Sequence, residues 1–293
     1  MSRLTWPADL GPVICVVGAR PNFMKMAPIL RAFAANTPAI PTLLVHTGQH
    51  YDKDMNDKLF EDLRLPRPDI NLEVGSGSHA VQTAEVMRRF EPVIDLHQPS
   101  CVLVVGDVNS TLACTLVGVK KGVPVVHVEA GLRSYDRKMP EEINRVLTDQ
   151  VADLLYTTER SAEANLVREG VDAERVRFVG NVMIDSLLHN REFARPPARA
   201  IAAAGFDPAV IASAAGYGVV TLHRPSNVDH RHTLAPLLEV LSEVARQLPL
   251  VFAMHPRTRT NIERFGLQGL LDDSRLILLP PQGYLEMLGL MAG

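Results

Sequence analysis

The chain has 293 residues, 46% hydrophobic and 22% charged, a composition typical of a globular protein and a length that suits two domains. Its formal net charge is −3 and its basic residues are scattered, so neither nucleic acid nor an anionic membrane is an expected partner. The first residues lack the apolar stretch of a signal peptide, no apolar run could cross a bilayer, and Cys15, Cys101 and Cys114 form no CxxC pair. We therefore expect a soluble, cytoplasmic protein with reduced cysteines.

Short β-branched runs alternate with helical patterns along the chain. Strands are predicted at residues 13–17, 42–46, 101–106, 123–128, 153–157, 176–179, 218–222, 250–254 and 275–279. Helices are predicted at residues 22–35, 52–63, 79–96, 110–121, 140–152, 159–169, 233–247 and 259–270. This alternation predicts βαβ crossovers and parallel sheets, and strands that are apolar on both faces require helices on both sides. The predicted fold class is therefore α/β.

The alternation breaks between residues 183 and 216, and we place a domain boundary at Gly180–Asn181. This gives an N-terminal domain of residues 1–181 and a C-terminal domain of residues 182–293. The second domain has only three predicted strands before the apolar helix EMLGLMAG, whereas a doubly wound half has about five or six. We therefore expect the second domain to be truncated.

Polar side chains follow most of the predicted strands at the point where each strand ends. In an open parallel sheet the ligand lies beyond the carboxyl ends of the strands, so these residues are candidates for a site. They are Arg20, the run His46–Thr47–Gly48–Gln49–His50, Gly106–Asp107, His127–Val128–Glu129, His223 with Arg224, and His255 with Arg257. Because six strands contribute, we expect a shared cleft between two sheets.

The first strand is followed by GARPNFMK, where a nucleotide-binding domain would carry several glycines. Pro21 suits the first helical position, and the free N–H groups and dipole of that turn favour an anion. Arg20 and Lys25 add two cations, and together these features predict a phosphate or pyrophosphate site. The alternative is that both are solvated side chains on a helix surface.

Carboxylates at two strand ends are candidates for acid and base chemistry. Asp107 and Glu129 both stand where a strand meets a turn, and converging carboxylates can have their pKa values driven apart. Asp107 could instead cap the following helix. In MPEEINRVLTDQ, an inward apolar face with Ile143 would leave Glu141 and Arg145 as a surface pair.

Ten histidines raise a metal hypothesis, which the sequence does not favour. There is no HExxH spacing and no set of cysteine ligands, so no metal is expected.

Taken in order, several motifs resemble the non-hydrolysing UDP-N-acetylglucosamine (UDP-GlcNAc) 2-epimerases across nearly the whole chain. They are VVGARPNFMKMAP, GQHYDKDM, VVGDVNST, HVEAGLRS, MPEEINR, FVGNVMID and TLHRPSNVD, and HVEAGLR with PEEINR is the most specific combination. The resemblance implies two Rossmann-like domains facing a cleft, the glycosyltransferase-B-like architecture, and a homodimer. It also implies interconversion of UDP-GlcNAc and UDP-N-acetylmannosamine (UDP-ManNAc) in amino-sugar supply for surface polysaccharide.

In that family a base removes the C2 proton while UDP leaves C1, and the 2-acetamidoglucal is reprotonated on its opposite face before UDP returns. The leaving group drives the reaction, so no nicotinamide or metal cofactor is implied. The resemblance places catalytic carboxylates at Asp107, Glu129 and Glu141, and a histidine near the diphosphate at His223. The other candidate substrate-binding residues are Arg20, Lys25, Arg145 beside Glu141, Arg224, His255, and Gln282 near the uracil. Gln49 and His50 are candidates for a second, activating UDP-GlcNAc site.

The sequence departs from the family pattern in three places. The run His223–Arg224–Pro225–Ser226 replaces a common HRRE, and Met287 stands where an aromatic residue often flanks the uracil. The family's Ser-Gly-Gly turn and following glutamate would come after residue 293.

Three other functions stay open on the sequence alone. An inactive fragment could bind a UDP-sugar weakly without turnover. A glycosyltransferase could use the same architecture, although it has no use for a base at C2. A hydrolysing epimerase would release UDP and free N-acetylmannosamine.

Overall fold

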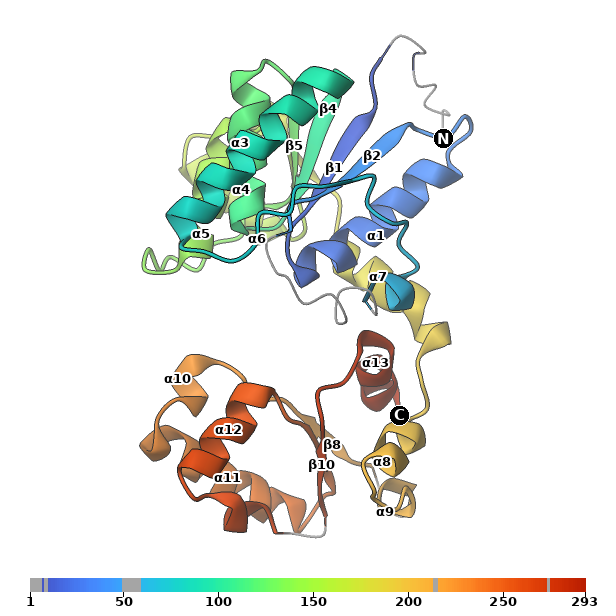
Figure 1. Ribbon diagram of the computed structural model, residues 1–293, viewed down its shortest axis with the longest axis vertical. Helices are drawn as coiled ribbons and strands as arrows, with labels where there is room; N and C mark the ends of the chain where they lie inside the picture. Colours follow the sequence, from blue (N-terminus) through green and yellow to red (C-terminus); the bar gives the residue numbers. More distant parts are fainter. Residues whose placement is uncertain (1–6, 8–9, 49–58, 213–215, 273–274) are drawn as a thin grey trace. The chain divides into compact units, whose positions relative to one another are not determined.

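The computed structural model describes residue 7 and residues 10–48, 59–212, 216–272 and 275–293 (Figure 1). The chain forms two compact units, residues 1–189 and 190–293. Helix α7 (Val182–Asn190) thus falls almost wholly in the first unit, whereas the boundary predicted from the sequence lies in front of it. None of the helices in the described ranges has both the length and the apolar character needed to span a membrane.

The first unit is built on a seven-stranded parallel sheet with the order β3-β2-β1-β4-β5-β6-β7. Its strands are β1 (Val13–Val17), β2 (Thr42–His46), β3 (Ile70–Asn71), β4 (Cys101–Val105), β5 (Val125–Ala130), β6 (Leu154–Thr157) and β7 (Val176–Phe178). The helices before α7 that lie wholly within the described residues are α1 (Arg20–Ala35), α3 (His79–His97), α4 (Asn109–Lys120), α5 (Pro140–Val151), α6 (Arg160–Arg168) and the 3-10 turn η1 (Ala173–Arg175), and residues 59–63 are also helical. The six predicted strands are present, and β3 is an addition too short to show a sequence pattern.

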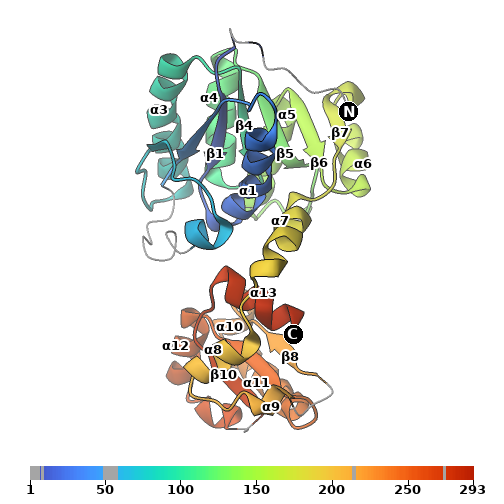
Figure 2. The same cartoon turned by 90° about the vertical axis from the view of Figure 1, so that its right-hand side faces the viewer.

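Strands β1 and β4 are neighbours, although the chain leaves β1 toward β2 and leaves β4 toward β5. Accordingly α1 covers one face of the sheet, while α3, α4 and α5 cover the other (Figures 1 and 2). The carboxyl ends of β1 and β4 therefore form the topological switch point, where open α/β sheets bind their ligands.

The core of the first unit explains why β1 and β4 are continuous apolar runs. Every residue of the β1 segment VICVV is buried, because helices pack on both faces of the sheet. On one of these faces Phe90 of α3 is fully buried among side chains of α4 and of the central strands.

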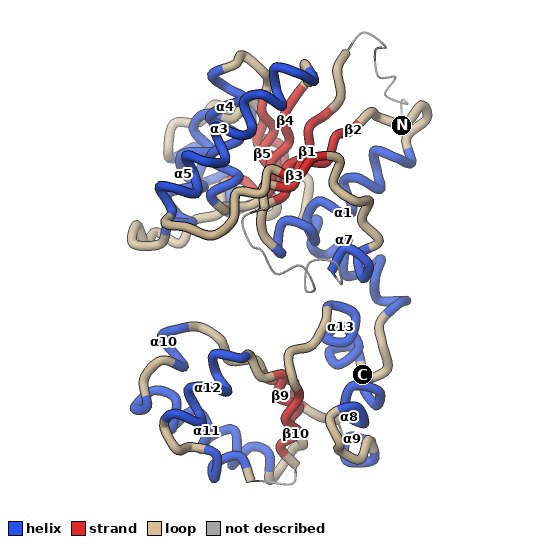
Figure 3. The backbone as a smooth tube through the Cα atoms, viewed as in Figure 1, coloured by secondary structure: helices blue, strands red, loops and turns tan. Residues whose placement is uncertain are grey.

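The second unit has a three-stranded parallel sheet with the order β10-β9-β8. Its strands are β8 (Gly218–Val220), β9 (Leu250–Ala253) and β10 (Leu276–Leu279). Its helices are α8 (Pro197–Ala203), α9 (Ala209–Ala212), α10 (Pro225–Val228), α11 (Arg231–Ala245), α12 (Pro256–Arg264) and α13 (Tyr284–Ala292), with 3-10 turns η2 (Arg191–Phe193) and η3 (Gln268–Leu271). Helices α11 and α12 pack on one face and α8 and α13 on the other (Figure 3). Both units are therefore parallel α/β layers, which confirms the predicted fold class.

We expect Phe90→Ala to lower the free energy of unfolding of the first unit by about 3–5 kcal/mol, because it removes a fully buried ring and leaves a cavity. Urea unfolding followed by circular dichroism measures the loss. The control is Leu96→Ala on the same helix, where the side chain is 77% exposed, and this change should cost less than about 0.5 kcal/mol. Equal effects of the two changes would contradict the core assignment.

Candidate active site

The backbone N–H groups of the turn after β1 donate hydrogen bonds within the turn itself. Arg20, rather than Pro21, is the first residue of α1, and Arg20 is exposed. The Asn22 Oδ1 accepts hydrogen bonds from the N–H groups of Gly18 and Ala19, both at 3.1 Å, and its Nδ2 donates to the Val105 carbonyl at 3.0 Å. The Asn22 N–H donates to the Ala19 carbonyl at 2.9 Å, and Pro21 has no N–H. The expected backbone cradle for an anion is therefore largely occupied, and the turn offers the Arg20 side chain instead.

Lys25 lies inside the first unit and pairs with a candidate catalytic carboxylate. The residue is 8% exposed, and its ammonium forms an ion pair with Glu129 at the end of β5. The alternative of a solvated surface lysine is therefore wrong for Lys25. Gly106 leaves the space for this pair, since a Cβ there would lie 2.8 Å from Lys25 Nζ and 3.4 Å from Glu129 Oε2.

Glu129 has an unusual backbone conformation. Its φ is 73°, in the left-handed region that residues other than glycine rarely adopt. The register between β5 and β6 also shifts between Val128 and Ala130. Such a conformation costs on the order of 1–3 kcal/mol, and irregular strand ends of this kind re-aim side chains beside active sites. This local strain is consistent with a functional role for Glu129.

Asp107 is held by Arg145 and does not cap a helix. The residue before α4 is Val108, with no side-chain capping hydrogen bond, so the capping alternative is wrong. Arg145 forms an ion pair with Asp107 and a second with Glu142, whose Oε2 lies 3.2 Å from Arg145 Nη1. In the part of the chain that the structure describes, no ion pair joins Arg145 to Glu141, so the alternative of a surface pair is wrong.

Glu142, which is not among the residues predicted from the sequence, fixes the loop after β5. Its two carboxylate oxygens accept hydrogen bonds from the N–H groups of Ser134 at 3.0 Å and Tyr135 at 2.9 Å. Burial raises the pKa of the Glu142 carboxyl, but these backbone donors and the Arg145 charge outweigh it, so its pKa lies below the usual value. Glu141 and Glu142 are adjacent and identical in type, so in the sequence they differ only in the direction in which each would point from the helix.

Glu141 lines a hollow of about 280 Å³ in which three helices begin. The lining also includes Val108 and Asn109 at the start of α4, and Asn144 of α5. The Asn144 side chain donates to the Asp107 carbonyl at 2.9 Å. Glu141 and Asp107 therefore flank the same polar edge of the first unit.

Helix α5 has a polar face turned toward the interior and an apolar face turned outward, the reverse of the expected arrangement. Its buried residues are polar, namely Glu142, Asn144, Thr148 and Asp149. The apolar residues Met139, Ile143, Leu147 and Val151 are 37–46% exposed and recur every four positions. The expected inward apolar face is wrong, because the inner face of this helix provides hydrogen bonds to the strand ends.

In the second unit, the carboxyl ends of β8 and β9 bring two histidines together. The rings of His223 and His255 have centroids 6.1 Å apart. His255 precedes α12 and accepts a hydrogen bond from the Arg257 N–H at 3.2 Å, so its Nδ1 is the acceptor. Arg257 itself pairs with Asp229.

The remaining candidates of the second unit lie at the ends of β8 and β10. Arg224 is exposed directly before α10, and the Gln282 Nε2 donates to the Pro280 carbonyl at 2.7 Å. Met287 packs against the core of the second unit. The candidate activating residues Gln49 and His50 lie outside the described residues.

We expect Glu142→Gln to reduce stability at about pH 7 by about 2 kcal/mol, since an amide cannot accept all of these hydrogen bonds. Because folding lowers the pKa of this carboxyl, its contribution is fully present above the usual carboxyl pKa and is lost as the pH falls. The difference between the two proteins should therefore shrink toward zero below about pH 4. Urea unfolding at several pH values measures it.

The adjacent Glu141→Gln is the matched control for this measurement and should cost less stability than Glu142→Gln at neutral pH. A stability difference that does not change on acidification would contradict the assigned role of Glu142.

Comparisons with known proteins agree on one family. The family model described as UDP-N-acetylglucosamine 2-epimerase matches residues 33–293. A UDP-N-acetylglucosamine 2-epimerase from Methanococcus maripaludis is 37% identical over 94% of this chain and 74% of its own length. A UDP-2,3-diacetamido-2,3-dideoxy-D-glucuronate 2-epimerase from Pseudomonas aeruginosa is 40% identical over 95% of this chain and 75% of its own length.

The solved structures give the same result for the fold. The structure of a Methanocaldococcus jannaschii UDP-GlcNAc 2-epimerase in complex with UDP-GlcNAc and UDP is 36% identical, with a TM-score of 0.74, over 94% of this chain and 75% of that one. The two α/β units thus correspond to the glycosyltransferase-B-like architecture that the resemblance implied. Sequence motifs, fold and relatives together show that this chain is an epimerase and belongs to the non-hydrolysing UDP-N-acetylglucosamine 2-epimerase family.

Proposed function

We propose that the protein interconverts UDP-GlcNAc and UDP-ManNAc by eliminating and re-adding UDP through 2-acetamidoglucal. One carboxylate takes the C2 proton, the electrons of that C–H bond form the C1–C2 double bond, and UDP leaves C1 with the electrons of the C–O bond. Return of a proton to the other face of C2 and of UDP to C1 completes the reaction. No electrons are gained or lost overall, so the reaction has no need of a redox cofactor.

The observation that carries this proposal is the set of carboxylates beside the switch point of the first sheet. Glu129 and Asp107 each pair with a cation, Lys25 and Arg145 respectively, while Glu141 lines the adjacent hollow. A reaction that removes a proton from one face and returns it to the other needs two groups that can exchange protons. A glycosyltransferase would not need this arrangement beside its leaving group.

The cations support binding of the diphosphate. Arg20 is exposed at the start of α1, and in the second unit we assign His223, Arg224 and His255 to the diphosphate and Gln282 to the uracil. Stabilising charge on a departing group is commonly the largest contribution to such catalysis. The free cysteines of the described residues suit a reducing compartment, which supports a cytoplasmic location.

One relative makes a second UDP-sugar a candidate substrate. The Pseudomonas aeruginosa protein named for UDP-2,3-diacetamido-2,3-dideoxy-D-glucuronate is as similar to this chain as those named for UDP-GlcNAc. The same C2 chemistry would apply to that sugar. A comparison of kcat/KM for the two UDP-sugars decides between them, and a higher value for the diacetamido uronate would replace UDP-GlcNAc in the proposal.

In deuterated water we expect the protein to incorporate deuterium at C2 of the sugar and to form both epimers, with no accumulation of free UDP. Asp107→Asn, Glu129→Gln and Glu141→Gln should each lower kcat by about 10²–10⁴-fold, because each removes a group that can transfer a proton. Nuclear magnetic resonance (NMR) spectroscopy of the sugar follows both exchange and epimerisation.

The matched control is Glu174→Gln, which changes an exposed carboxylate and should leave kcat unchanged. Steady release of UDP and free N-acetylmannosamine would overturn the non-hydrolysing mechanism. Binding of UDP without any C2 exchange would favour the alternative of an inactive binding protein.

We further propose that the protein is a homodimer that uses the outward face of α5. Met139, Ile143, Leu147 and Val151 form an apolar stripe on a helix whose inner face is polar. A row of exposed apolar side chains along one helix face is a candidate interaction surface.

Leu147→Glu should convert the dimer to a monomer, because it places a charge in the middle of the stripe, where burial would be costly. Light scattering coupled to size-exclusion chromatography measures the mass. Val240→Glu, at a position of the second unit that is 56% exposed, is the control and should leave the mass unchanged. A Leu147→Glu protein with the wild-type dimer mass would rule out this face.

A further inference from the structure

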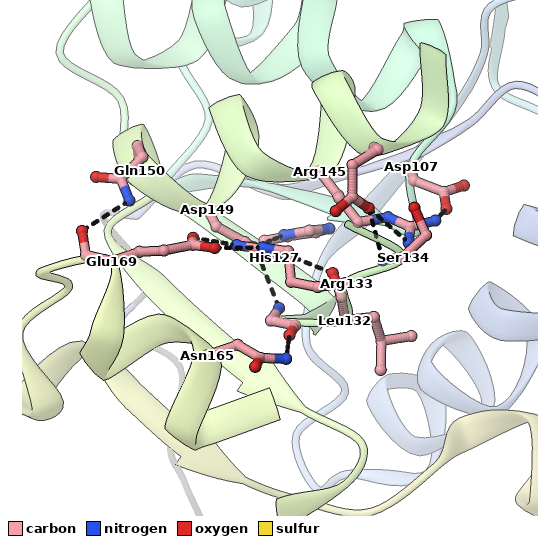
Figure 4. A network of polar contacts seen from close by, with 12 residues as sticks. Asp107, His127, Leu132, Arg133, Ser134, Arg145, Asp149, Gln150, Asn165 and Glu169 are labelled. Carbon is pink, nitrogen blue, oxygen red and sulfur yellow. Dashed lines mark hydrogen bonds and ion pairs between the residues drawn. The ribbon is translucent and has the colours of Figure 1, made fainter. Parts of the chain in front are cut away.

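His127 and Asp149 form a buried pair that the proposed chemistry does not use. Both side chains are fully buried, and His127 Nδ1 lies 2.7 Å from Asp149 Oδ1. The other ring nitrogen, Nε2, lies 2.7 Å from the Gly106 carbonyl oxygen. Figure 4 shows this pair within a wider set of polar contacts that also includes Arg133 and Glu169.

The partners of the ring determine where its protons are. A carbonyl oxygen has no proton to give, so Nε2 must donate to Gly106. Asp149 Oδ2 already accepts a hydrogen bond from the Gly131 N–H at 3.0 Å and forms an ion pair with Arg133 Nη1 at 2.8 Å, as an ionised carboxylate does. Asp149 Oδ1 therefore accepts from Nδ1, and the ring carries a proton on both nitrogens.

The surrounding charges agree with an imidazolium. Arg133 pairs with Asp149 and also with Glu169 at the end of α6, where the two side chains make two hydrogen bonds of 2.6 and 2.8 Å. With His127 charged, two cations face two carboxylates; with a neutral ring, one buried negative charge would be uncompensated. On the other side of Gly106 the Lys25–Glu129 pair is balanced in itself.

This pair controls the segment that carries Asp107. Gly106 donates its N–H to the Val128 carbonyl at 3.1 Å and accepts from His127, so both of its backbone groups are bound to β5. Its φ of 70° sets the sharp turn into Asp107. We propose that His127, held as an imidazolium between Asp149 and the Gly106 carbonyl, is the positioning residue for the Asp107 carboxylate. The catalytic consequence rests on the proposed epimerase function.

The protonation state is tested directly on the whole chain labelled with ¹⁵N-histidine. We expect NMR spectra at about pH 7 to show protons on both ring nitrogens of one histidine. Those signals should vanish in His127→Gln and persist in the control His97→Gln. A His127 ring with one unprotonated nitrogen, and hence a protonated Asp149, would overturn the proposal.

The positioning role is tested with two replacements of the same ring. His127→Phe keeps a ring but removes both hydrogen bonds, and should lower kcat by about 100-fold while KM changes less than about twofold. His127→Gln can still donate to the Gly106 carbonyl and should recover at least about 10-fold of that loss in kcat. Equal kcat values for the two variants, or an effect confined to KM, would contradict the positioning role.

A further measurement separates this proposal from the proposed function. If the wild-type protein turns over no UDP-sugar, the epimerase proposal fails, but hydrogen exchange still reports on the turn. Amide exchange in a peptide covering residues 105–108 should be about 10-fold faster in His127→Phe than in His127→Gln. Identical exchange rates would show that His127 does not hold this turn.

Discussion

The arrangement of the polar strand ends depends on the contacts of one buried group, the Asp149 carboxylate. Removing a carboxylate from water costs several kcal/mol, and here that cost is offset by donors from His127, Gly131 and Arg133. These donors come from β5 and from the loop that follows it, while Asp149 itself lies on α5. Burial raises the pKa of Asp149, but hydrogen bonds and charges from His127 and Arg133 outweigh it and hold the pKa below its usual value. The end of β5, the turn after β4 and helix α5 are thereby fixed relative to one another.

This use of α5 explains its inverted polarity. A helix whose inner face supplies Glu142, Asn144 and Asp149 to neighbouring loops cannot also supply an apolar layer to the core. The apolar residues that give the helix its periodicity are then left on the outside, where they form the surface that we propose for the dimer. In this reading the polar network at the site and the proposed dimer surface are two consequences of one helix orientation.

Much of the fold could be predicted because burial on both faces produces apolar strands, which are visible in the sequence. The strand ends also indicated Asp107 and Glu129, since the topology brings carboxyl ends together. The orientation of α5 could not be predicted, because hydrogen bonds to distant loops overrode the usual preference for apolar contact. Which of Glu141 and Glu142 is buried could not be predicted either. Neighbouring residues on a helix point in different directions, and only tertiary contacts decide which one faces the interior. Nothing in the sequence marked the left-handed conformation of Glu129, which residues other than glycine rarely adopt.

The glycine-poor turn after β1 also gains a physical explanation. A glycine-rich loop binds phosphate through its backbone N–H groups, but here Asn22 binds those of Gly18 and Ala19 and connects them to β4. Anion binding at this turn is therefore left to side chains, and one of its two cations, Lys25, already neutralises Glu129. In the proposed elimination, a base loses its negative charge as it takes the C2 proton while the diphosphate gains charge as it leaves. With Glu129 as that base, Lys25 is then left with a cationic charge that Glu129 no longer matches, at the moment when a new anion forms. Lys25 favours the elimination to the extent that its charge interacts more strongly with the departing diphosphate than with the Glu129 carboxylate it pairs with beforehand, because acceleration requires stronger stabilisation of the transition state than of the bound substrate.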